Sequence, residues 1–336
     1  MIQIDAIRLH SSVDEVLLKT AAFAASAAKR IGDQVECTEL RKSDALSSDL
    51  GANIFLKLEN MQTTGSFKLR GATNLLMTLS DDERAKGCVT ASSGNHGAAV
   101  ACAMQKLGTK GVIFVPEQTS DIKIGKIQSY GGDVRFFGTD GLDTEQHARE
   151  YAEENGMLYL SPYNDEQVIA GQGTCGVEIL DQLPGIDAVF IAVGGGGLIG
   201  GVGSVLKAHN SAIQVYGCQP KASAVMAHSI EAGQILDLPS EPTLSDGTAG
   251  GIEACAITFP LNQAVVDEFI VVNEEQIAAA MRLYMEVEGH NIEGAAGVAV
   301  AGMVARREEI LGRNVVVIIC GGNVSEETVA LVKGHT

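Results

Sequence analysis

The chain has 336 residues, enough for about two domains that each bury a core. A hydrophobic fraction of 46%, with 39 glycines and 7 prolines, excludes a disordered or collagen-like chain. The formal charge of −18 argues against nucleic-acid binding, which depends on clustered lysine and arginine. The most apolar runs, at 189–193 and 315–320, are too short to cross a bilayer, and the N-terminus does not look like an export signal. We therefore expect no membrane role.

Seven cysteines are dispersed along the chain, without a CxxC pair or a histidine at metal-binding spacing. An odd, scattered set of this kind is typical of reduced thiols. We therefore expect a cytoplasmic protein that binds no metal ion.

Hydrophobic periodicity predicts an amphipathic helix at 14–31 and a strand at 54–60 that leads into a polar loop. Helices and short aliphatic strands then alternate. The first half predicts helix 97–107 stopped by Gly108, strand 112–115, helix 121–130, strand 134–137, helix 143–155 and strand 157–160. The second half predicts helix 173–183, strand 187–193, helix 198–208, strand 213–218, helices 274–289 and 295–308, and strand 314–319. This alternation predicts two α/β units with parallel sheets, but it fixes no boundary between them.

The segment VFIAVGGGGLIGG, 189–201, sets four consecutive glycines, Gly194, Gly195, Gly196 and Gly197, between a buried strand and a helix. Without side chains, several backbone N–H groups of such a turn can converge on an anion at the positive end of the helix, which predicts a phosphate site. The segment also satisfies GxGxxG, but a dinucleotide site needs an acid after the next strand, where Gln219 stands. A purely structural glycine turn remains a third interpretation.

The segment TASSGNHGAAVA, 90–101, crowds Ser92, Ser93, Asn95 and His96 at a predicted helix start. Hydroxyls, an amide and free N–H groups at this position favour a second anion such as a carboxylate. The alternative is an ordinary helix cap, for which one serine or asparagine would suffice.

Lys68, in TTGSFKLRGA at 63–72, is either surface charge or a nucleophilic amine. The phosphate site favours the second interpretation, because pyridoxal phosphate (PLP) needs both a Schiff-base lysine and a phosphate cradle. Cys320, in VVVIICGGNV at 315–324, follows a buried strand and should lie at the carboxyl edge of a parallel sheet, where ligands gather. Its alternative role is that of a buried structural cysteine.

Together these segments resemble the fold type II family of PLP enzymes, the tryptophan synthase β superfamily, and within it the threonine/serine dehydratase and serine racemase branch. The similarity runs from about residue 14 to 330, and the lysine motif GSFKxRGA is matched at 65–72. VIAGQGT at 168–174 and IEGAAGVAVA at 292–301 also match. The resemblance implies an α/β fold of two open, mostly parallel twisted sheets. A small domain, 59–155, would be inserted into a large PLP-binding domain made of 1–58 and 156–336.

The resemblance also implies a role for each site residue. The catalytic residues would be Lys68, which forms the Schiff base, and Ser93, which in racemases handles the proton on the opposite face. The other cofactor contacts would be Phe67 on the ring, Asn95 on the 3′ oxygen, Gly194 to Gly197 on the phosphate, Glu293 near the cofactor and Cys320 on the pyridine nitrogen. The substrate carboxylate would be held by Ser92, Ser93, Gly94 and His96.

The implied activity is dehydration of a β-hydroxy amino acid, L-threonine or L-serine, to a 2-oxo acid and ammonia. Serine racemase activity and dehydration of phenylserine or hydroxyaspartate remain alternatives, as do a nucleotide-dependent oxidoreductase and a non-catalytic PLP-binding protein. The family's habit implies a homodimer.

Three departures from the family pattern qualify these expectations. Gln219 and Val225 stand where relatives with a cation site carry acids, so we expect no bound cation. Thr38–Glu39–Leu40 replaces the usual Thr-Pro-Leu, which puts regulatory nucleotide binding in doubt. The sequence ends at 336, shortly after Cys320, so we expect no feedback control by isoleucine through a C-terminal domain.

Overall fold

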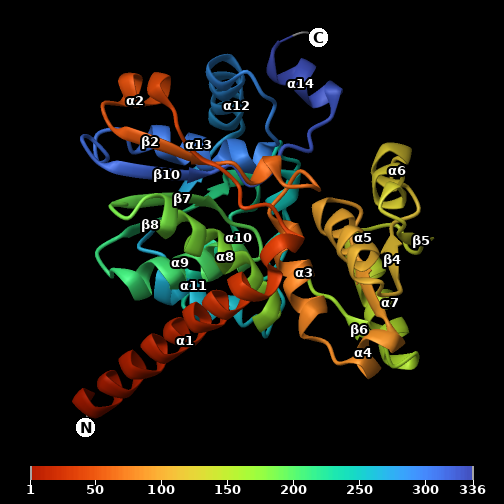
Figure 1. Ribbon diagram of the computed structural model, residues 1–336. Coiled ribbons are helices and arrows are strands. Elements are labelled where there is room, and N and C mark those ends of the chain that lie inside the picture. The colour runs from red at the N-terminus through yellow and green to blue at the C-terminus, as the bar shows by residue number, and fades with distance from the viewer. Residues whose placement is uncertain (1, 335–336) are drawn as a thin grey trace.

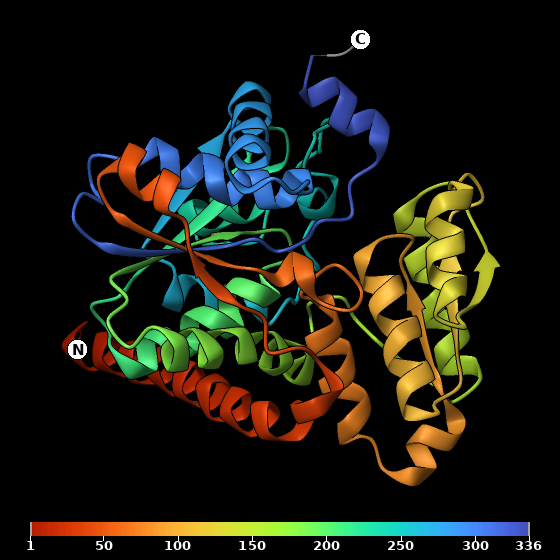
Figure 2. The ribbon, with the colours of Figure 1, turned by 45° about the horizontal axis from the view of Figure 1, so that its top comes forward.

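The computed structural model describes residues 2–334 and contains two open α/β units (Figures 1 and 2). The larger sheet has six strands. Their spatial order is β1 (Leu40–Lys42), β2 (Asn53–Lys57), β10 (Asn314–Ile318), β7 (Ala188–Ala192), β8 (Gln214–Pro220) and β9 (Glu268–Val272). All neighbouring strands are parallel except β1 and β2, which are antiparallel.

The smaller sheet has four strands, all parallel. Their order is β5 (Asp133–Phe136), β4 (Gly111–Val115), β3 (Cys88–Ala91) and β6 (Leu158–Tyr159). These strands all fall between β2 and β7 in the sequence. The α/β fold with two open, mostly parallel sheets is therefore confirmed, while the domain boundaries at 59 and 155 stay a prediction.

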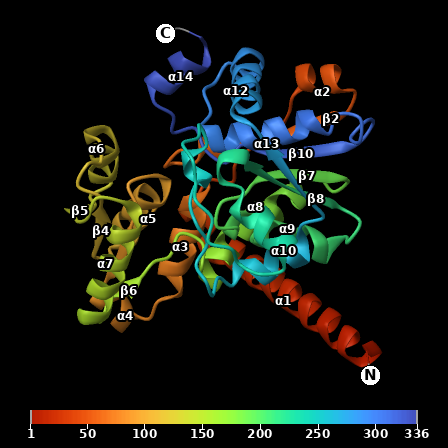
Figure 3. The ribbon, with the colours of Figure 1, turned by 180° about the vertical axis from the view of Figure 1, so that it is seen from behind.

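Helices cover both faces of the larger sheet (Figures 1 and 3). One side carries α1 (Ile2–Ile31), α8 (Glu166–Gln182), α9 (Gly197–His209), α10 (Val225–Ala232) and α11 (Thr258–Val265). The other carries α2 (Asp44–Leu50), α12 (Glu274–Glu288) and α13 (Gly294–Ala305), with α14 (Glu326–Val332) near the C-terminus. The helices around the smaller sheet are α3 (Lys68–Thr78), α4 (Asp81–Lys86), α5 (Asn95–Leu107), α6 (Asp121–Ser129) and α7 (Gly141–Glu154). None of the helices within 2–334 is both long and apolar enough to cross a membrane.

The central strands of the larger sheet lie between two layers of helices, which explains why their residues are almost all apolar. Every residue of β7 is buried, as is every residue of α13 from Gly294 to Met303. A helix that is apolar on all sides must be covered on all sides. The small residues of α13 allow this, because they let neighbouring elements approach closely.

Local sequence patterns predicted the positions of most helices and strands, but several predicted ends differ from the observed ones. Gly108 closes α5 in the left-handed region (φ 66°), as its position predicts. Helix α8 begins at Glu166, before the predicted residue 173, because the Asp165 carboxylate accepts hydrogen bonds from the first-turn N–H groups. Helix α1 likewise begins at Ile2 rather than at residue 14. Strands β1, β3 and β9 are additional to the predicted set.

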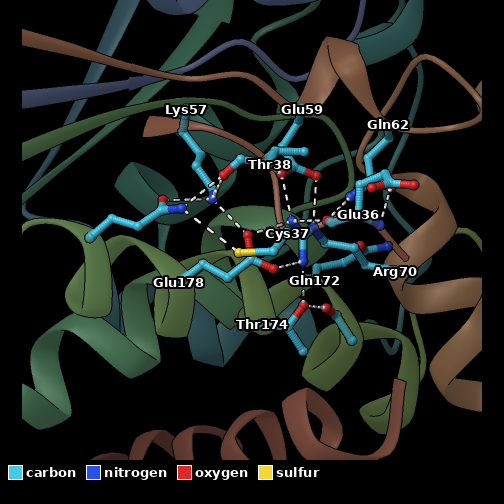
Figure 4. A network of polar contacts seen from close by, with 12 residues as sticks. Glu36, Cys37, Thr38, Lys57, Glu59, Gln62, Arg70, Gln172, Thr174 and Glu178 are labelled. Atoms are coloured by element: carbon cyan, nitrogen blue, oxygen red, sulfur yellow. Dashed lines mark hydrogen bonds and ion pairs between the residues drawn. The ribbon is translucent and has the colours of Figure 1, made fainter. Parts of the chain in front are cut away.

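A buried guanidinium ties the larger sheet to the helices beneath it (Figure 4). Arg70 Nε and Nη2 donate to the Glu59 carboxylate at 2.7 and 2.8 Å, and both side chains are fully buried. Arg70 also donates to both carboxylate oxygens of Glu178, at 2.6 and 2.8 Å, and to Thr174 Oγ1 at 3.1 Å. The Arg70 charge and its hydrogen bonds lower the pKa of Glu59 against the opposing effect of burial. Glu59 and Arg70 therefore form an ionised pair, in which each side chain depends on the other.

Lys57, the last residue of β2, extends this cluster (Figure 4). Its buried ammonium donates to Glu178 Oε2 at 2.6 Å, to the Thr38 carbonyl at 2.6 Å and to Gln182 Oε1 at 3.0 Å. Two cations thus share the Glu178 carboxylate between β2, α3 and α8.

Replacing Arg70 tests the importance of this cluster. We expect Arg70→Leu to lower the free energy of unfolding by about 3 to 5 kcal/mol, because the fully buried Glu59 carboxylate would lose its guanidinium partner, while Glu178 would keep Lys57. Urea denaturation measures this. Arg135→Leu is the matched control: Arg135 pairs with Asp133 at the surface, so its loss should cost less than about 1 kcal/mol. Equal stabilities for the two variants would contradict the expectation.

Candidate active site

A cavity of about 670 Å³ lies at the carboxyl ends of strands from both sheets. Its wall includes Ala91 at the end of β3, Pro116 after β4, Ala192 at the end of β7 and Cys320 after β10. All the predicted site residues line it: Phe67, Lys68, Ser92, Ser93, Gly94, Asn95, His96, Gly194, Gly195, Gly196, Gly197, Glu293 and Cys320. The structure thus brings together residues from widely separated motifs.

Lys68 is the first residue of α3, and the backbone around it is held to the end of β10. The Phe67 N–H donates to the Cys320 carbonyl at 3.1 Å, and Ser66 forms an antiparallel bridge with Gly321. The Lys68 amine donates to the Pro162 carbonyl at 2.9 Å and lies 5.3 Å from the centre of the Phe67 ring. The amine therefore has a fixed place in the cavity wall.

Burial lowers the pKa of Lys68 to about 8, although the charges of Cys320 and Glu293 act in the opposite direction. A free lysine has a pKa of 10.5 and is almost entirely protonated at neutral pH. The lowered value gives Lys68 a larger neutral fraction, and only the neutral amine is nucleophilic.

The four glycines form a tight turn between β7 and α9, as predicted. Gly196 has φ +84°, which favours glycine, and α9 begins at Gly197. A Cβ at Gly195 would lie 2.4 Å from ring carbons of Tyr163. That ring leaves no room for a side chain at Gly195, and the first turn of α9 offers backbone N–H groups that can bind an anion.

Residues 92–94 join β3 to α5, whose first residues are Asn95 and His96. The Gly94 N–H donates to Ser92 Oγ at 3.2 Å. His96 is buried, and its Nε2 lies 3.1 Å from the Leu160 carbonyl. Since a carbonyl only accepts, Nε2 carries the proton, and burial followed by the charge of Lys68 lowers the histidine pKa to about 3. His96 is therefore neutral, and the loop offers an anion hydroxyls and helix-start N–H groups rather than a cation.

Asn95, Glu293 and Cys320 lie close together in another part of the cavity wall. Asn95 Nδ2 donates to the two Glu293 oxygens at 3.0 and 2.9 Å, and Cys320 Sγ lies 4.0 Å from Glu293 Oε1. Burial raises the pKa of Glu293 to about 7, with the Asn95 hydrogen bond opposing the shift. Burial also raises the pKa of the Cys320 thiol, which therefore stays protonated at neutral pH.

The structure adds cavity residues that the motifs did not identify. Pro162 and Tyr163 follow β6, and Thr248 is the last residue of the short 3-10 helix Asp246–Thr248. Lys126 of α6 and Asn323 also line the cavity. Pro162, Tyr163 and Asn323 had a usable signal, because each follows a predicted strand, whereas the placement of Thr248 and Lys126 could not be derived from the sequence.

Gln219 stands where relatives with a cation site carry an acidic residue. Its buried side chain donates to the Val193 carbonyl at 3.1 Å and accepts from the Ala227 N–H at 2.7 Å. Both ends of the amide are thus used by backbone groups. Among the residues described, no group of three or more His, Cys, Asp or Glu side chains could hold a metal ion. The expectation of no bound cation stays a prediction.

These residues fit one type of cofactor. A nucleophilic lysine, a glycine turn at a helix start, an amide donor and a buried thiol share a single cavity, which is the arrangement expected of an enzyme that binds PLP. A family model described as "Pyridoxal-phosphate dependent enzyme" matches residues 31–321. The chain belongs to this family of PLP-dependent enzymes.

Individual relatives narrow the comparison. L-threonine ammonia-lyase of Thermotoga maritima is 39% identical over 298 residues, which cover 89% of this chain and 74% of that protein. The structure of processed threonine deaminase isoform 2 from Solanum lycopersicum superposes with a TM-score of 0.90 at 35% identity, covering 95% of this chain and 93% of that one. Maize serine racemase superposes with a TM-score of 0.87 at 32% identity, covering 93% and 96%. Two activities are thus represented among these three proteins.

The pKa of Lys68 can be tested through covalent capture of PLP. We expect the cofactor-free protein to attach PLP at Lys68 at a rate that rises with pH to a midpoint near 8, because protonation blocks the amine below that pH. Borohydride trapping followed by peptide mass spectrometry measures the attachment. Lys68→Ala should show no attachment, and a wild-type midpoint near 10.5 would show that the site does not perturb the amine.

The glycine turn can be tested at Gly195. A Cβ there would meet the Tyr163 ring, which the Glu253 N–H holds by donating to its hydroxyl at 3.0 Å. Crowding of this kind costs about 1 to 3 kcal/mol, so Gly195→Ala should weaken PLP binding about tenfold or more in an absorbance titration. Gly251→Ala, whose Cβ would meet nothing within 4 Å, is the control from the same cavity. Equal affinities of the two variants would refute the close fit.

Proposed function

We propose that this protein is a PLP-dependent ammonia-lyase that dehydrates a β-hydroxy amino acid, L-threonine or L-serine, to a 2-oxo acid and ammonia. The observation that carries the proposal is the Lys68 amine, with a pKa near 8, in one cavity with the glycine turn and the Cys320 thiol. The 39% identity to an L-threonine ammonia-lyase supports the choice of substrate.

Backbone dipoles bind the two anionic groups in this proposal. The turn at Gly194 to Gly197 holds the cofactor phosphate at the start of α9. The start of α5, with the hydroxyls of Ser92 and Ser93, holds the substrate carboxylate. His96 contributes its backbone N–H and keeps its ring on the Leu160 carbonyl.

Lys68 and Cys320 determine the type of chemistry. When bound, PLP supplies a ring that takes up the electron pair left by the Cα–H bond. Lys68 is the base that removes the Cα proton, because a pKa near 8 lets it accept and release protons near neutral pH. The protonated Cys320 thiol beside the ring nitrogen stabilises a charged ring less than a carboxylate would. This partner disfavours transamination and suits loss of the β-hydroxyl group.

Racemisation of serine is the second candidate. Ser93 lines the cavity together with Lys68, so two groups able to handle a proton are present. The structural similarity to maize serine racemase supports this candidate. The two activities differ in their products, which are a 2-oxo acid and ammonia in one case and D-serine in the other.

We also propose that the protein acts in the cytoplasm as a homodimer. All seven cysteines are free thiols, which supports a reducing compartment. Light scattering on the purified protein tests the dimer.

A substrate screen tests the proposed activity. We expect L-threonine or L-serine to release equal amounts of ammonia and 2-oxo acid, with no release by Lys68→Ala. The screen includes hydroxyaspartate, because Lys123 and Lys126 line the cavity, and phenylserine, because Ile122 adds an apolar surface there. D-serine without ammonia would favour the racemase, and a chain that binds PLP but turns over none of these compounds would refute the proposal.

A further inference from the structure

A line of polar contacts runs along one wall of the cavity from α6 to Glu293. The Lys126 ammonium donates a hydrogen bond to Asn323 Oδ1. Asn323 Nδ2 donates to Asn95 Oδ1 at 2.6 Å and to the Thr64 carbonyl at 3.0 Å. Asn95 Nδ2 in turn donates to both oxygens of Glu293. The line thus connects a helix of the smaller unit to the segment that follows β10.

The chemistry of the partners fixes the direction of these hydrogen bonds. A half-turn of an amide exchanges its donor and acceptor ends, so the partners decide which end faces where. The Lys126 ammonium only donates and the Thr64 carbonyl only accepts, and both demand the same orientation of Asn323. A rotated Asn323 would set its NH₂ group against the ammonium and its oxygen against two other oxygens. Asn95 therefore meets a donor at its oxygen, and its own N–H groups point away from Asn323, toward Glu293 in the cavity wall.

We propose that Lys126 is a positioning residue that acts through Asn323 to orient the Asn95 amide with its N–H toward the cofactor. The inference rests on the proposed function, in which Asn95 contacts the 3′ oxygen of PLP. A donor aimed at that oxygen stabilises its ionised form. It therefore lowers the pH at which the bound cofactor loses its proton, and a misdirected amide raises that pH.

Replacing Lys126 removes both a positive charge and the hydrogen bond that orients Asn323. The experiment has to separate these two effects, because several titratable groups face this part of the cavity. They are Lys123 and Lys126 on α6, Lys68 on α3, His96 on α5, Asp246 in the 3-10 helix, Glu293 before α13 and Cys320 after β10. Burial lowers the pKa of Lys126, and the charge of Glu293 opposes that shift. Lys123 offers a comparison, since it lies one turn earlier on α6 but pairs with Asp246 at 3.7 Å. Its removal takes away the same charge without removing the donor to Asn323.

The experiment is a pH titration of the cofactor absorbance in the holoenzyme. Loss of one hydrogen bond should raise the midpoint of Lys126→Met by about 0.5 to 1 pH unit. Lys126→Arg keeps the donor and should restore the wild-type midpoint. Lys126→Gln can donate but carries no charge, so its midpoint should fall between those of the wild type and Lys126→Met. Lys123→Met should shift the midpoint less than Lys126→Met does.

Three results would overturn the proposal. Equal shifts in Lys126→Met, Lys126→Gln and Lys123→Met would mean that the cation acts by charge alone. An unchanged midpoint in Lys126→Met, beside a shifted one in Asn95→Ala, would mean that the Asn95 contact exists without needing Lys126. If Asn95→Ala also leaves the midpoint unchanged, the contact itself fails and the inference with it. Ammonia release by the wild-type enzyme shows independently whether the proposed activity stands.

Discussion

The position of the reactive lysine depends on a buried guanidinium two residues away. Arg70 shares α3 with Lys68 and is fully buried between Glu59 and Glu178. A buried charge is stable only where its partners meet it with good geometry, so this cluster allows few alternative arrangements of β2, α3 and α8. Lys57 adds a second cation that binds Glu178. The network thus fixes the start of α3 relative to the larger sheet, and the main chain places Lys68 at the cavity.

The chemistry of Lys68 follows from this position. The Phe67 N–H binds the carbonyl of Cys320, so the lysine and the thiol are held on adjoining segments. Burial lowers the pKa of the amine, while Glu293 and Cys320 limit the shift. Burial raises the pKa of Glu293 itself to about 7. The Glu293 charge that opposes the lowering of the Lys68 pKa therefore depends on pH in the same range. The cavity is thus a coupled set of groups, in which each protonation state affects the others.

The sequence was most informative where a local rule determines the structure. Gly108 ends α5, the glycine turn precedes α9, and the alternation of strands and helices predicts the parallel sheets, because these features depend on neighbouring residues. Contacts between distant segments have no such signal. Nothing near Lys126 in the sequence indicates Asn323, and nothing near Arg70 indicates Glu178. Such pairs depend on how the two units are packed, and the family resemblance could supply the roles of site residues but not these supporting contacts.

The cavity resolves a conflict between the acidic chain and its anionic ligands. A protein with a formal charge of −18 must attract a phosphate and a carboxylate by local means. Among the described residues, those that line the cavity include no arginine, and His96 is neutral. Beside the cavity's lysines, the starts of α9 and α5 supply positive potential through backbone dipoles that need no proton. In our proposals the lysine side chains have other tasks, which are proton transfer at Lys68 and orientation of an amide by Lys126.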